Sequence, residues 1–382
     1  MAYPKVDFLY LNEEDMVKAG VLDGVRCTDC MEELLKLLDE GRYRMGGDNG
    51  NSHGTMISFP EAEDSKFPEM PVNGPDRRFM AMPAYVGGKF DLAGVKWYGS
   101  NVENRDEGLP RSILMVMLND KKTGAPIALM SANLLSAERT ASIPGAGVKN
   151  LSLPDSKVLG IVGPGVINTI AIKTFGELRP SLDTLKIKGR GRASIDRCIA
   201  FVKENCPQFT NIEVVDTLEE CVRGSDIVNF ATSTTMGGNG SADYPFVEED
   251  WIKPGALICV PGSANFDDEF LAKRAKLVVD NIKLYDAWEE EYGPEAFETI
   301  YIPGCKFLDM VDRGEMTRDH IDDLGAILNG KKPGRESPEQ KIIYSIGGMP
   351  VEDVAWGKDI YEYAVEHGIG QKLNLWDKPM LF

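Results

Sequence analysis

Short apolar segments alternate with amphipathic helical segments between residues 158 and 280, and this alternation limits the fold more than any other feature of the sequence. Each apolar segment has the length of a buried strand, and the residues between segments place apolar side chains on one helical face. The predicted strands are Val158–Val162, Leu185–Lys188, Ile212–Val215, Ile227–Thr232, Leu257–Val260 and Leu277–Asp280. Such alternation is typical of a parallel, doubly wound sheet, because right-handed crossover helices return the chain to the same end of each strand.

The first 150 residues follow a different pattern. A helix is predicted over residues 27–41, and a loop-rich stretch over residues 46–78 holds one short candidate strand, Thr55–Phe59. Asp120–Gly124 has the composition of a hairpin turn. Four longer strands are predicted at residues 79–86, 92–99, 112–120 and 126–132. This part of the chain is therefore expected to form an α+β domain.

These patterns predict an α/β protein with two domains. Residues 1–150 are expected to form the first domain, and residues 151–329 a Rossmann domain with a doubly wound parallel sheet. The polar segment Gly330–Pro338 is interpreted as a linker, and a final helix is predicted over Val351–His367. Residues 330–382 are expected to fold back onto the first domain and complete it.

The charge balance and the cysteine content exclude several classes of protein. The chain has 42 basic and 60 acidic residues and a net charge of −18, which argues against nucleic acid or an anionic membrane as a partner. No apolar run reaches the roughly 18 residues of a transmembrane helix, and the N-terminus lacks a signal-peptide core, which predicts a cytoplasmic protein. Seven cysteines and three histidines show neither a disulfide framework nor zinc spacing, so no metal site is expected.

The strongest local motif lies between the first predicted strand of the Rossmann domain and the helix that follows. Gly163 permits a tight turn there, and Gly165 lets the backbone approach a pyrophosphate at the helix N-terminus. Asn168 replaces the usual third glycine, and a plain turn without a ligand is the alternative. The five residues expected at the dinucleotide are Gly163, Gly165, Val166, Ile167 and Asn168.

The end of the second strand of this domain indicates which nicotinamide cofactor binds. An NAD site usually carries an acidic residue there, which holds the ribose 2′-hydroxyl. This chain has no acidic residue at that point and has basic residues instead, which favours NADP(H) over NAD(H) because arginine binds a 2′-phosphate. The residues expected at the phosphate are Lys188, Arg190, Arg192 and Ser194. A solvated basic turn without a ligand is the alternative.

Short motifs spread along nearly the whole chain carry a family resemblance. They are Leu9–Asp15, Met82–Tyr85, Gly94–Lys96, Thr123–Pro126, Leu135–Ala141, the dinucleotide turn, Lys253–Gly255, Gly262–Ser263, Ser345–Gly347 and Glu352–Ala355. In this order the motifs resemble those of the ornithine cyclodeaminase/mu-crystallin family. The resemblance implies an NAD(P)-dependent enzyme acting at the α-carbon of an amino or imino acid. It also implies a homodimer formed through residues 1–150, which would bind the substrate as well.

The resemblance assigns roles to two basic residues. Lys96 matches the family's catalytic lysine, which can bind a carboxylate or donate a proton to nitrogen. Arg139 matches an arginine whose planar guanidinium fits the substrate α-carboxylate. The alternatives are a surface lysine on an edge strand and a helix-surface arginine paired with Glu138 or with other acidic residues.

Two departures from the family pattern bear on the reaction. Ser263 stands where cyclodeaminases carry an aspartate that acts on the substrate amine, which favours imine reduction or amine oxidation over ornithine cyclisation. His53 is the candidate replacement for an early arginine of the family, with Arg44, Arg77 and Arg78 nearby in sequence. A loop histidine without a role is the alternative.

Further residues are expected at the substrate and at the cofactor. Met82 is a candidate substrate contact, although Met82, Trp97 and Tyr98 are also interpreted as core residues. The residues expected at the cofactor from the later strands are Thr232, Ser233, Thr234, Ser263 and Gly347.

Three functions are open on the sequence alone. The favoured one is an NADP(H)-dependent oxidoreductase that acts on the C–N bond of a small amino or imino acid. The alternatives are a cyclodeaminase that keeps NAD bound, and a non-catalytic, crystallin-like protein that binds NADP and a small acid. Because the same fold serves all three, the fold does not decide between them.

Overall fold

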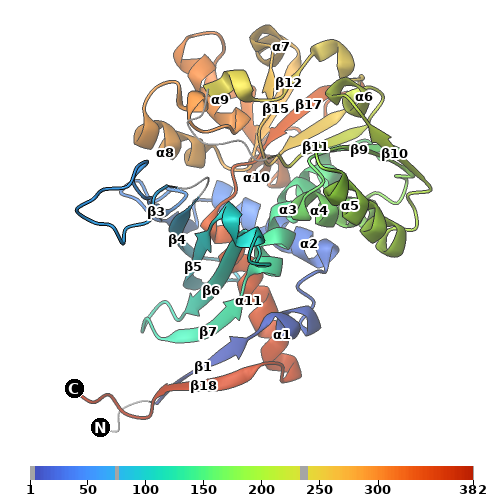
Figure 1. Cartoon of the computed structure of the whole chain (residues 1–382). Helices are drawn as coiled ribbons and strands as arrows, with labels where there is room; N and C mark the ends of the chain where they lie inside the picture. Colours follow the sequence, from blue (N-terminus) through green and yellow to red (C-terminus); the bar gives the residue numbers. More distant parts are fainter. Residues whose placement is uncertain (1–4, 74–76, 233–239, 382) are drawn as a thin grey trace. The chain divides into compact units, whose positions relative to one another are not determined.

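The computed structural model describes residues 5–73, 77–232 and 240–381, and the chain divides into two compact units (Figure 1). Unit 1 consists of residues 1–22, 41–136 and 349–382, and unit 2 consists of residues 23–40 and 137–348. Each unit is built around one eight-stranded sheet. None of the helices in the described ranges is both long enough and apolar enough to cross a membrane.

Unit 2 contains the predicted parallel sheet, with the strand order β10-β9-β8-β11-β13-β17-β15-β16. Every neighbouring pair in it runs parallel. The strands are β8 (Val158–Val162), β9 (Thr184–Lys188), β10 (Asn211–Val215), β11 (Ile227–Phe230), β13 (Leu257–Val260), β15 (Ala275–Val279), β16 (Ile321–Asp323) and β17 (Lys341–Ser345). The predicted doubly wound sheet is therefore confirmed, with two strands beyond the six predicted.

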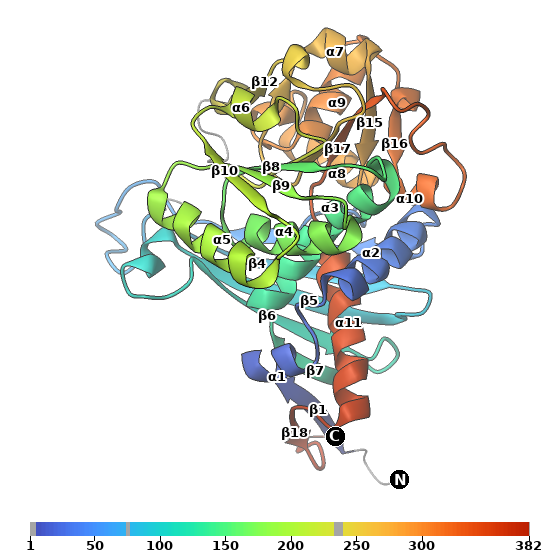
Figure 2. The ribbon, with the colours of Figure 1, turned by 90° about the vertical axis from the view of Figure 1, so that its right-hand side faces the viewer.

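Helices cover both sides of this sheet, and Figure 2 shows α4 and α5 on the side opposite to α6. The helices of this region are α2 (Gly24–Asp39), α3 (Asn133–Leu151), α4 (Val166–Leu178), α5 (Arg192–Asn205), α6 (Leu218–Val222), α7 (Asp268–Lys273), α8 (Ile282–Tyr292), α9 (Pro303–Asp312) and α10 (Leu324–Leu328). A two-stranded sheet joins β12 (Phe246–Val247) to β14 (Asn265–Phe266). Short 3-10 helices lie at Val102–Arg105, Gly240–Asp243, Glu249–Trp251, Ala296–Glu298 and Arg318–His320.

The unit boundaries differ from the predicted boundaries at 150 and 329. Strand β17 lies in the unit 2 sheet between β13 and β15, so the C-terminal return to unit 1 begins at Met349 rather than at residue 330. The buried residues Ile342 and Ile343 explain this position, because such an apolar segment belongs in a sheet interior. Helix α2 belongs to unit 2 because its apolar face packs against α4 and α10.

Unit 1 is a mixed sheet with the order β18-β1-β7-β6-β5-β4-β2, and β3 pairs with β4. Its strands are β1 (Val6–Leu11), β2 (Tyr43–Met45), β3 (Thr55–Ile57), β4 (Arg78–Val86), β5 (Leu92–Ser100), β6 (Ser112–Asn119), β7 (Pro126–Ser131) and β18 (Gln371–Trp376). The C-terminal strand β18 runs antiparallel to β1, and both lie near the chain ends in Figure 1. The predicted completion of this α+β sheet by the C-terminal segment is confirmed.

Helix α11 (Pro350–His367) covers one face of the unit 1 sheet, over β4, β5 and β6, and α1 (Glu13–Lys18) lies beside β1 and β7 (Figures 1 and 2). Along β5 the residues alternate between the two faces, so Gly94, Lys96 and Tyr98 are buried while Trp97 is exposed. A side chain at Gly94 would come within 3.0 Å of Val354 Cγ2. The glycine therefore lets α11 approach the middle of the sheet.

Candidate active site

The sheet order of unit 2 reverses between β8 and β11, where a doubly wound sheet opens a crevice for a ligand. The first strand β8 has β9 on one side and β11 on the other. All strands of this sheet are parallel, so the residues that follow β8, β9, β11, β13 and β17 meet at one edge. The predicted cofactor residues belong to these five connections.

The glycine turn after β8 has the geometry that a dinucleotide needs. Gly163 has a φ of +88°, and its N–H donates to Lys188 O at 2.9 Å. Gly165 is the N-cap of α4, which starts without any capping side chain, so its backbone donors remain available to an anion. A Cβ atom built on Gly165 would have no heavy atom within 4 Å. These residues fit a bound pyrophosphate.

The residues that follow the glycines divide into one exposed and one buried position. Val166 is 67% exposed at the start of α4, whereas Asn168 is fully buried. The Asn168 amide donates to Val162 O at 2.9 Å and to Gly163 O at 2.8 Å, and its oxygen accepts from Asn229 Nδ2 at 2.7 Å. The Asn168 side chain therefore ties the turn to β8 and β11, and the contact of this residue with the cofactor stays a prediction.

The basic residues at the end of β9 also divide into two groups. Lys188 Nζ donates to Asp216 O at 2.6 Å, so its amine is engaged by the protein backbone. Arg190 is exposed, and Arg192 is exposed with an ion pair to Asp196 at 2.9 Å. Ser194 Oγ donates to Gly191 O at 3.1 Å at the start of α5. The two arginines are therefore the accessible cations of this turn.

The connections after β11 and β13 are joined by hydroxyl contacts. Thr232 Oγ1 lies 3.1 Å from Ser263 Oγ and donates to Ser263 O at 3.3 Å. Ser263 is completely buried, and its hydroxyl supports the loop; its contacts with substrate and cofactor stay predictions. The predicted cofactor residues Ser233 and Thr234 lie outside the described residues.

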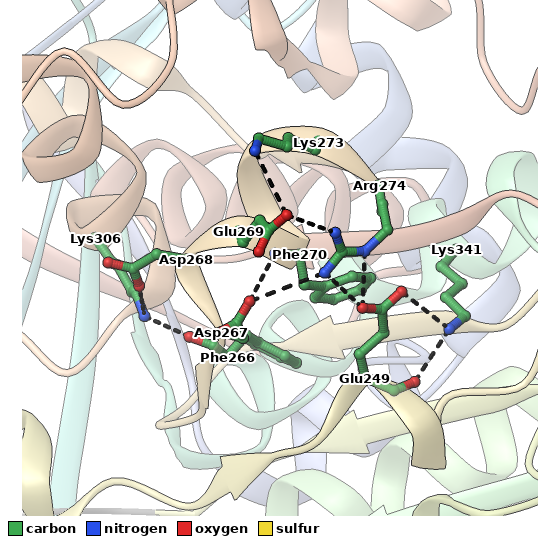
Figure 3. A network of polar contacts seen from close by, with 10 residues as sticks. All are labelled: Glu249, Phe266, Asp267, Asp268, Glu269, Phe270, Lys273, Arg274, Lys306 and Lys341. Atoms are coloured by element: carbon green, nitrogen blue, oxygen red, sulfur yellow. Dashed lines mark hydrogen bonds and ion pairs between the residues drawn. The ribbon is translucent and has the colours of Figure 1, made fainter.

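An ion-pair network holds the segment that follows Ser263 (Figure 3). Lys306 donates to Asn265 Oδ1 at 2.7 Å and pairs with Asp268 at 2.6 Å. On the other side of α7, Arg274 and Lys341 both bind Glu249. The network fixes both ends of α7 and thereby the loop after β13.

Asp280 organises the turn after β17. Its carboxylate accepts from the N–H groups of Gly347 at 2.8 Å and Gly348 at 3.1 Å, and from the Tyr285 hydroxyl at 2.9 Å. Burial raises the pKa of Asp280, while these donors lower it. Gly348 has a φ of +75°, and a Cβ atom there would lie 3.2 Å from Arg139 Nη1. Arg139 therefore lies against this turn.

Arg139 and Glu138 are both buried in the middle of α3. Glu138 Oε1 accepts from Thr174 Oγ1 at 3.1 Å and from Ser142 Oγ at 3.4 Å. Burial raises the pKa of Glu138 to about 7, and the hydrogen bonds only partly oppose this shift. The alternative pairing of Arg139 with Glu138 at the helix surface is therefore wrong, since neither side chain lies there.

The raised pKa of Glu138 predicts a pH-dependent stability. The folded state holds the proton more tightly than the unfolded state, so its stability falls as pH rises from about 4.5 to about 7. Glu138→Gln keeps the two acceptor contacts without the charge. We expect it to raise the free energy of unfolding by about 1–3 kcal/mol at pH 8, with the gain vanishing below pH 4.5. Urea unfolding across this range measures the difference, and a gain that does not depend on pH would contradict the expectation.

In unit 1, Lys96 is buried at the centre of β5. It lies opposite Met82 of β4 on one side and Val116 of β6 on the other. Its Nζ atom donates to Asp353 Oδ2 at 2.8 Å and to Ser136 Oγ at 3.4 Å. The Lys96 side chain is 3% exposed and that of Asp353 is 0% exposed, so the surface-lysine alternative is wrong.

The other two predicted residues of unit 1 lie close to this strand pair. Met82 is 1% exposed and belongs to a core cluster with Met80 and Tyr98, which agrees with its interpretation as a core residue, and its contact with substrate stays a prediction. His53 is partly buried between β2 and β3. The adjacent Gly54 is packed so closely on β4 that a Cβ atom would lie 2.7 Å from Ala81 O. Trp97, interpreted as a core residue, is 40% exposed on the opposite face.

Two acidic residues at these sites were not among the sequence-predicted site residues. Asp353 belongs to the motif Glu352–Ala355, but its partner Lys96 is 257 residues away. Asp280 follows a buried strand directly, which is a position where functional carboxylates are common in such sheets. In each case the residue type and its position in the sequence indicated a possible role, but the sequence did not show which residue it would contact.

All seven cysteines are buried, including Cys27 and Cys30 on α2. Within the described ranges, no three His, Cys, Asp or Glu side chains come together as metal ligands.

Comparisons with known proteins agree with the geometry. A sequence model of the ornithine cyclodeaminase/mu-crystallin family matches residues 24–368. The N-((2S)-2-amino-2-carboxyethyl)-L-glutamate dehydrogenase of Staphylococcus aureus is 26% identical over 97% of this chain and 99% of its own. A Thermococcus litoralis Delta(1)-pyrroline-2-carboxylate reductase, solved with NADH and L-proline, is 24% identical with a TM-score of 0.72, over 95% of this chain and 99% of its own. An archaeal alanine dehydrogenase dimer with bound NAD is 22% identical with a TM-score of 0.73, over 97% of this chain and 100% of its own.

Proposed function

Because the chain belongs to the ornithine cyclodeaminase/mu-crystallin family, we propose that it is an NADP(H)-dependent oxidoreductase acting on the C–N bond of a small amino or imino acid. The observation that carries this proposal is the turn from Gly163 to Gly165 at the point where the strand order reverses. Open space beside Gly165 and an uncapped α4 suit a pyrophosphate. The names of the relatives point the same way, since one is a dehydrogenase of an amino acid derivative and another holds NADH and L-proline.

Two basic residues are assigned to the substrate. Arg139 is suited to the α-carboxylate because a guanidinium binds a carboxylate through two parallel hydrogen bonds. Lys96 can bind that carboxylate or move the proton at the substrate nitrogen, and His53 or a water molecule is a further candidate for the proton. The nicotinamide, when bound, supplies or accepts a hydride at the α-carbon.

The uncharged Ser263 argues against cyclodeamination as the reaction of this protein. A cyclodeaminase releases ammonia from ornithine while its nicotinamide shows no net change in absorbance. We expect this protein to release no ammonia from ornithine, because Ser263 is buried and carries no charge that could act on an amine. Ammonia release without net nicotinamide turnover would instead assign the chain to the cyclodeaminase branch.

We also propose that Arg190 and Arg192 select NADP(H). No acidic residue ends β9, and both arginines are exposed beside the glycine turn. Replacing both with alanine should weaken NADPH binding by about 100-fold, because two charge-assisted contacts to the 2′-phosphate are lost. NADH binding should change less than about threefold, which titration calorimetry can measure.

Lys186 provides a matched control for this pair. It is a basic residue on β9, the strand that precedes the two arginines, but its Nζ atom donates to Glu220 O and Arg223 O. Lys186→Ala should therefore leave the ratio of the two dissociation constants unchanged. Equal affinity of the wild-type protein for NADPH and NADH would rule out the assignment.

The face of the unit 1 sheet opposite to α11 carries apolar side chains that favour a homodimer. Phe79 and Trp97 stack with ring centroids 6.0 Å apart, and Ile113 and Met115 lie beside them, each between 40% and 50% exposed. Together with Phe59 they line a cavity of about 490 Å³. An apolar surface of this kind marks a protein interface more often than a free face. A second copy of this chain is the proposed partner, as the archaeal alanine dehydrogenase is itself a dimer.

A charge on this face should separate the two copies. Trp97→Glu places a carboxylate in the apolar patch, where its burial against a partner would be costly. We expect analytical ultracentrifugation to show a dimer for the wild-type protein and a monomer for this variant. Val214→Glu is the control, because Val214 is 42% exposed on β10 of unit 2 and is not one of the patch residues. A monomeric wild-type protein would contradict the proposal.

A further inference from the structure

Two buried asparagines connect the glycine turn of unit 2 to the neighbouring strand. Asn168 is on α4, Asn229 is on β11, and both residues are 0% exposed. Their amide groups are joined by a hydrogen bond of 2.7 Å from Asn229 Nδ2 to Asn168 Oδ1. Burying an amide costs free energy unless its hydrogen bonds are made, so a pair of amides in the interior of the unit needs an explanation.

The hydrogen bonds of Asn168 have only one possible direction. Its Nδ2 atom donates to Val162 O at 2.9 Å and to Gly163 O at 2.8 Å, and a carbonyl oxygen can only accept. The Oδ1 atom of Asn168 therefore faces Asn229, where it needs a donor. Asn229 supplies this donor through Nδ2, which leaves Asn229 Oδ1 without a partner among the residues that the structure describes.

The unpaired oxygen means that Asn229 is not optimal for stability alone. A buried acceptor without a partner destabilises a fold, whereas an apolar side chain at the same place would avoid this cost. Asn229 is the one polar residue among the four residues of β11, all of which are buried. What its amide provides is the anchor for Asn168, and through Asn168 a fixed position of the turn.

Gly163 is the point at which this anchor meets the turn. Its φ is +88°, and a Cβ atom there would lie 2.9 Å from Ala231 O, so the turn packs closely on the end of β11. Its carbonyl oxygen accepts from Asn168. In the usual motif a third glycine lets the helix pack closely against the strand. Here Asn168 takes the place of that glycine and links α4 to the end of β8 by hydrogen bonds instead.

We infer that Asn168 and Asn229 are positioning residues for the dinucleotide pyrophosphate: Asn229 anchors Asn168, and Asn168 holds the turn at Gly163 in the shape that the pyrophosphate needs. This inference rests on the proposed function, and it extends the cofactor site to a strand residue 61 positions away from Asn168. Asn229 acts through Asn168 alone. Loss of both side chains should therefore cost no more cofactor affinity than loss of Asn168.

The affinity for NADPH, measured by titration calorimetry, tests this dependence in three variants. Asn168→Ala removes both donors to the turn and should weaken binding by about 30-fold. Asn229→Val removes the anchor and should weaken binding by about tenfold, and the double variant should match Asn168→Ala. The KM for NADPH should rise by the same factors, while kcat at saturating NADPH stays within about threefold of wild type. A double variant about 300-fold weaker than wild type would show independent effects and would overturn the inference.

Asn329→Ala is the matched control. The Asn329 amide also donates to two oxygens, Lys36 O at 3.1 Å and the carboxylate of Asp39, and thereby joins α10 to α2 within unit 2. Its loss should lower the unfolding temperature as well, while NADPH affinity stays within about twofold of wild type. An equal loss of affinity in this control would mean that a general loss of stability weakens binding, which would overturn the role of the pair.

Asn229→Val decides the question if Asn168→Ala does not fold. Valine suits a buried strand and removes the unpaired oxygen, so we expect this variant to be folded. It also leaves the Asn168 side chain in place, so an NADPH affinity equal to that of the wild type would show that the anchor is not needed. Failure of the proposed function is distinguishable, because the wild-type protein itself would then bind neither NADPH nor NADH.

Discussion

Replacing Lys96 with alanine should lower kcat by roughly a thousandfold, which is within the range that one positioned acid or base contributes. Lys96 is buried on β5 and donates to Asp353 at 2.8 Å, so the variant loses an ammonium group held at a fixed place in the structure. If Lys96 donates the proton, the substrate KM should change by less than about tenfold. Steady-state kinetics with the preferred imino acid measures both constants.

A control is needed because the alanine also removes a buried ion pair with Asp353. Lys276→Ala likewise removes a buried lysine that pairs with Asp322 in unit 2, where Lys332 stays 3.3 Å from the other carboxylate oxygen. We expect both variants to lose free energy of unfolding, about 3–5 kcal/mol for Lys96→Ala, while only Lys96→Ala loses turnover. Near-normal turnover of Lys96→Ala would remove this lysine from the mechanism.

Replacing Gly165 with valine should abolish nicotinamide binding without unfolding the protein. The φ of Gly165 is −88°, which a valine adopts without strain, and no heavy atom lies within 4 Å of a Cβ atom there. The valine would therefore occupy the open space in which the pyrophosphate is expected. We predict a loss of at least about 100-fold in cofactor affinity, or about 2.7 kcal/mol.

Gly334→Val is the control for this variant. Its built Cβ atom makes only ordinary contacts, the nearest at 3.5 Å to Ile327, in a connection outside the glycine turn. Both variants should unfold at temperatures close to that of the wild type, and only Gly165→Val should lose NADPH binding. Unchanged NADPH affinity in Gly165→Val would mean that the dinucleotide does not approach this turn.

The sequence predicted six strands of the parallel sheet because they are short, mostly apolar segments that alternate with helical segments. It did not predict β17, because the buried residues Ile342 and Ile343 follow the polar segment Gly330–Pro338 directly. Nor could it assign α2 to unit 2, since an amphipathic face shows that a helix is buried but not which helices bury it.

In the candidate site, too, features set by neighbouring residues could be predicted, whereas contacts between distant segments could not. The conformation of Gly163 follows from its own motif and could be predicted. The pairing of Lys96 with Asp353 depends on how α11 lies over β5, and no local pattern contains that information. The contacts of Asn168 with Asn229 and of Ser263 with Thr232 also join segments far apart in the sequence.

The most direct test of the proposed activity is a nicotinamide absorbance assay on the purified protein. NADPH and NADH would each be offered with cyclic imino acids, and with 2-oxo acids together with ammonia or methylamine. We predict consumption of NADPH in preference to NADH with one class of these substrates. If both nucleotides bound but neither was consumed with any substrate, the protein would not be the proposed oxidoreductase.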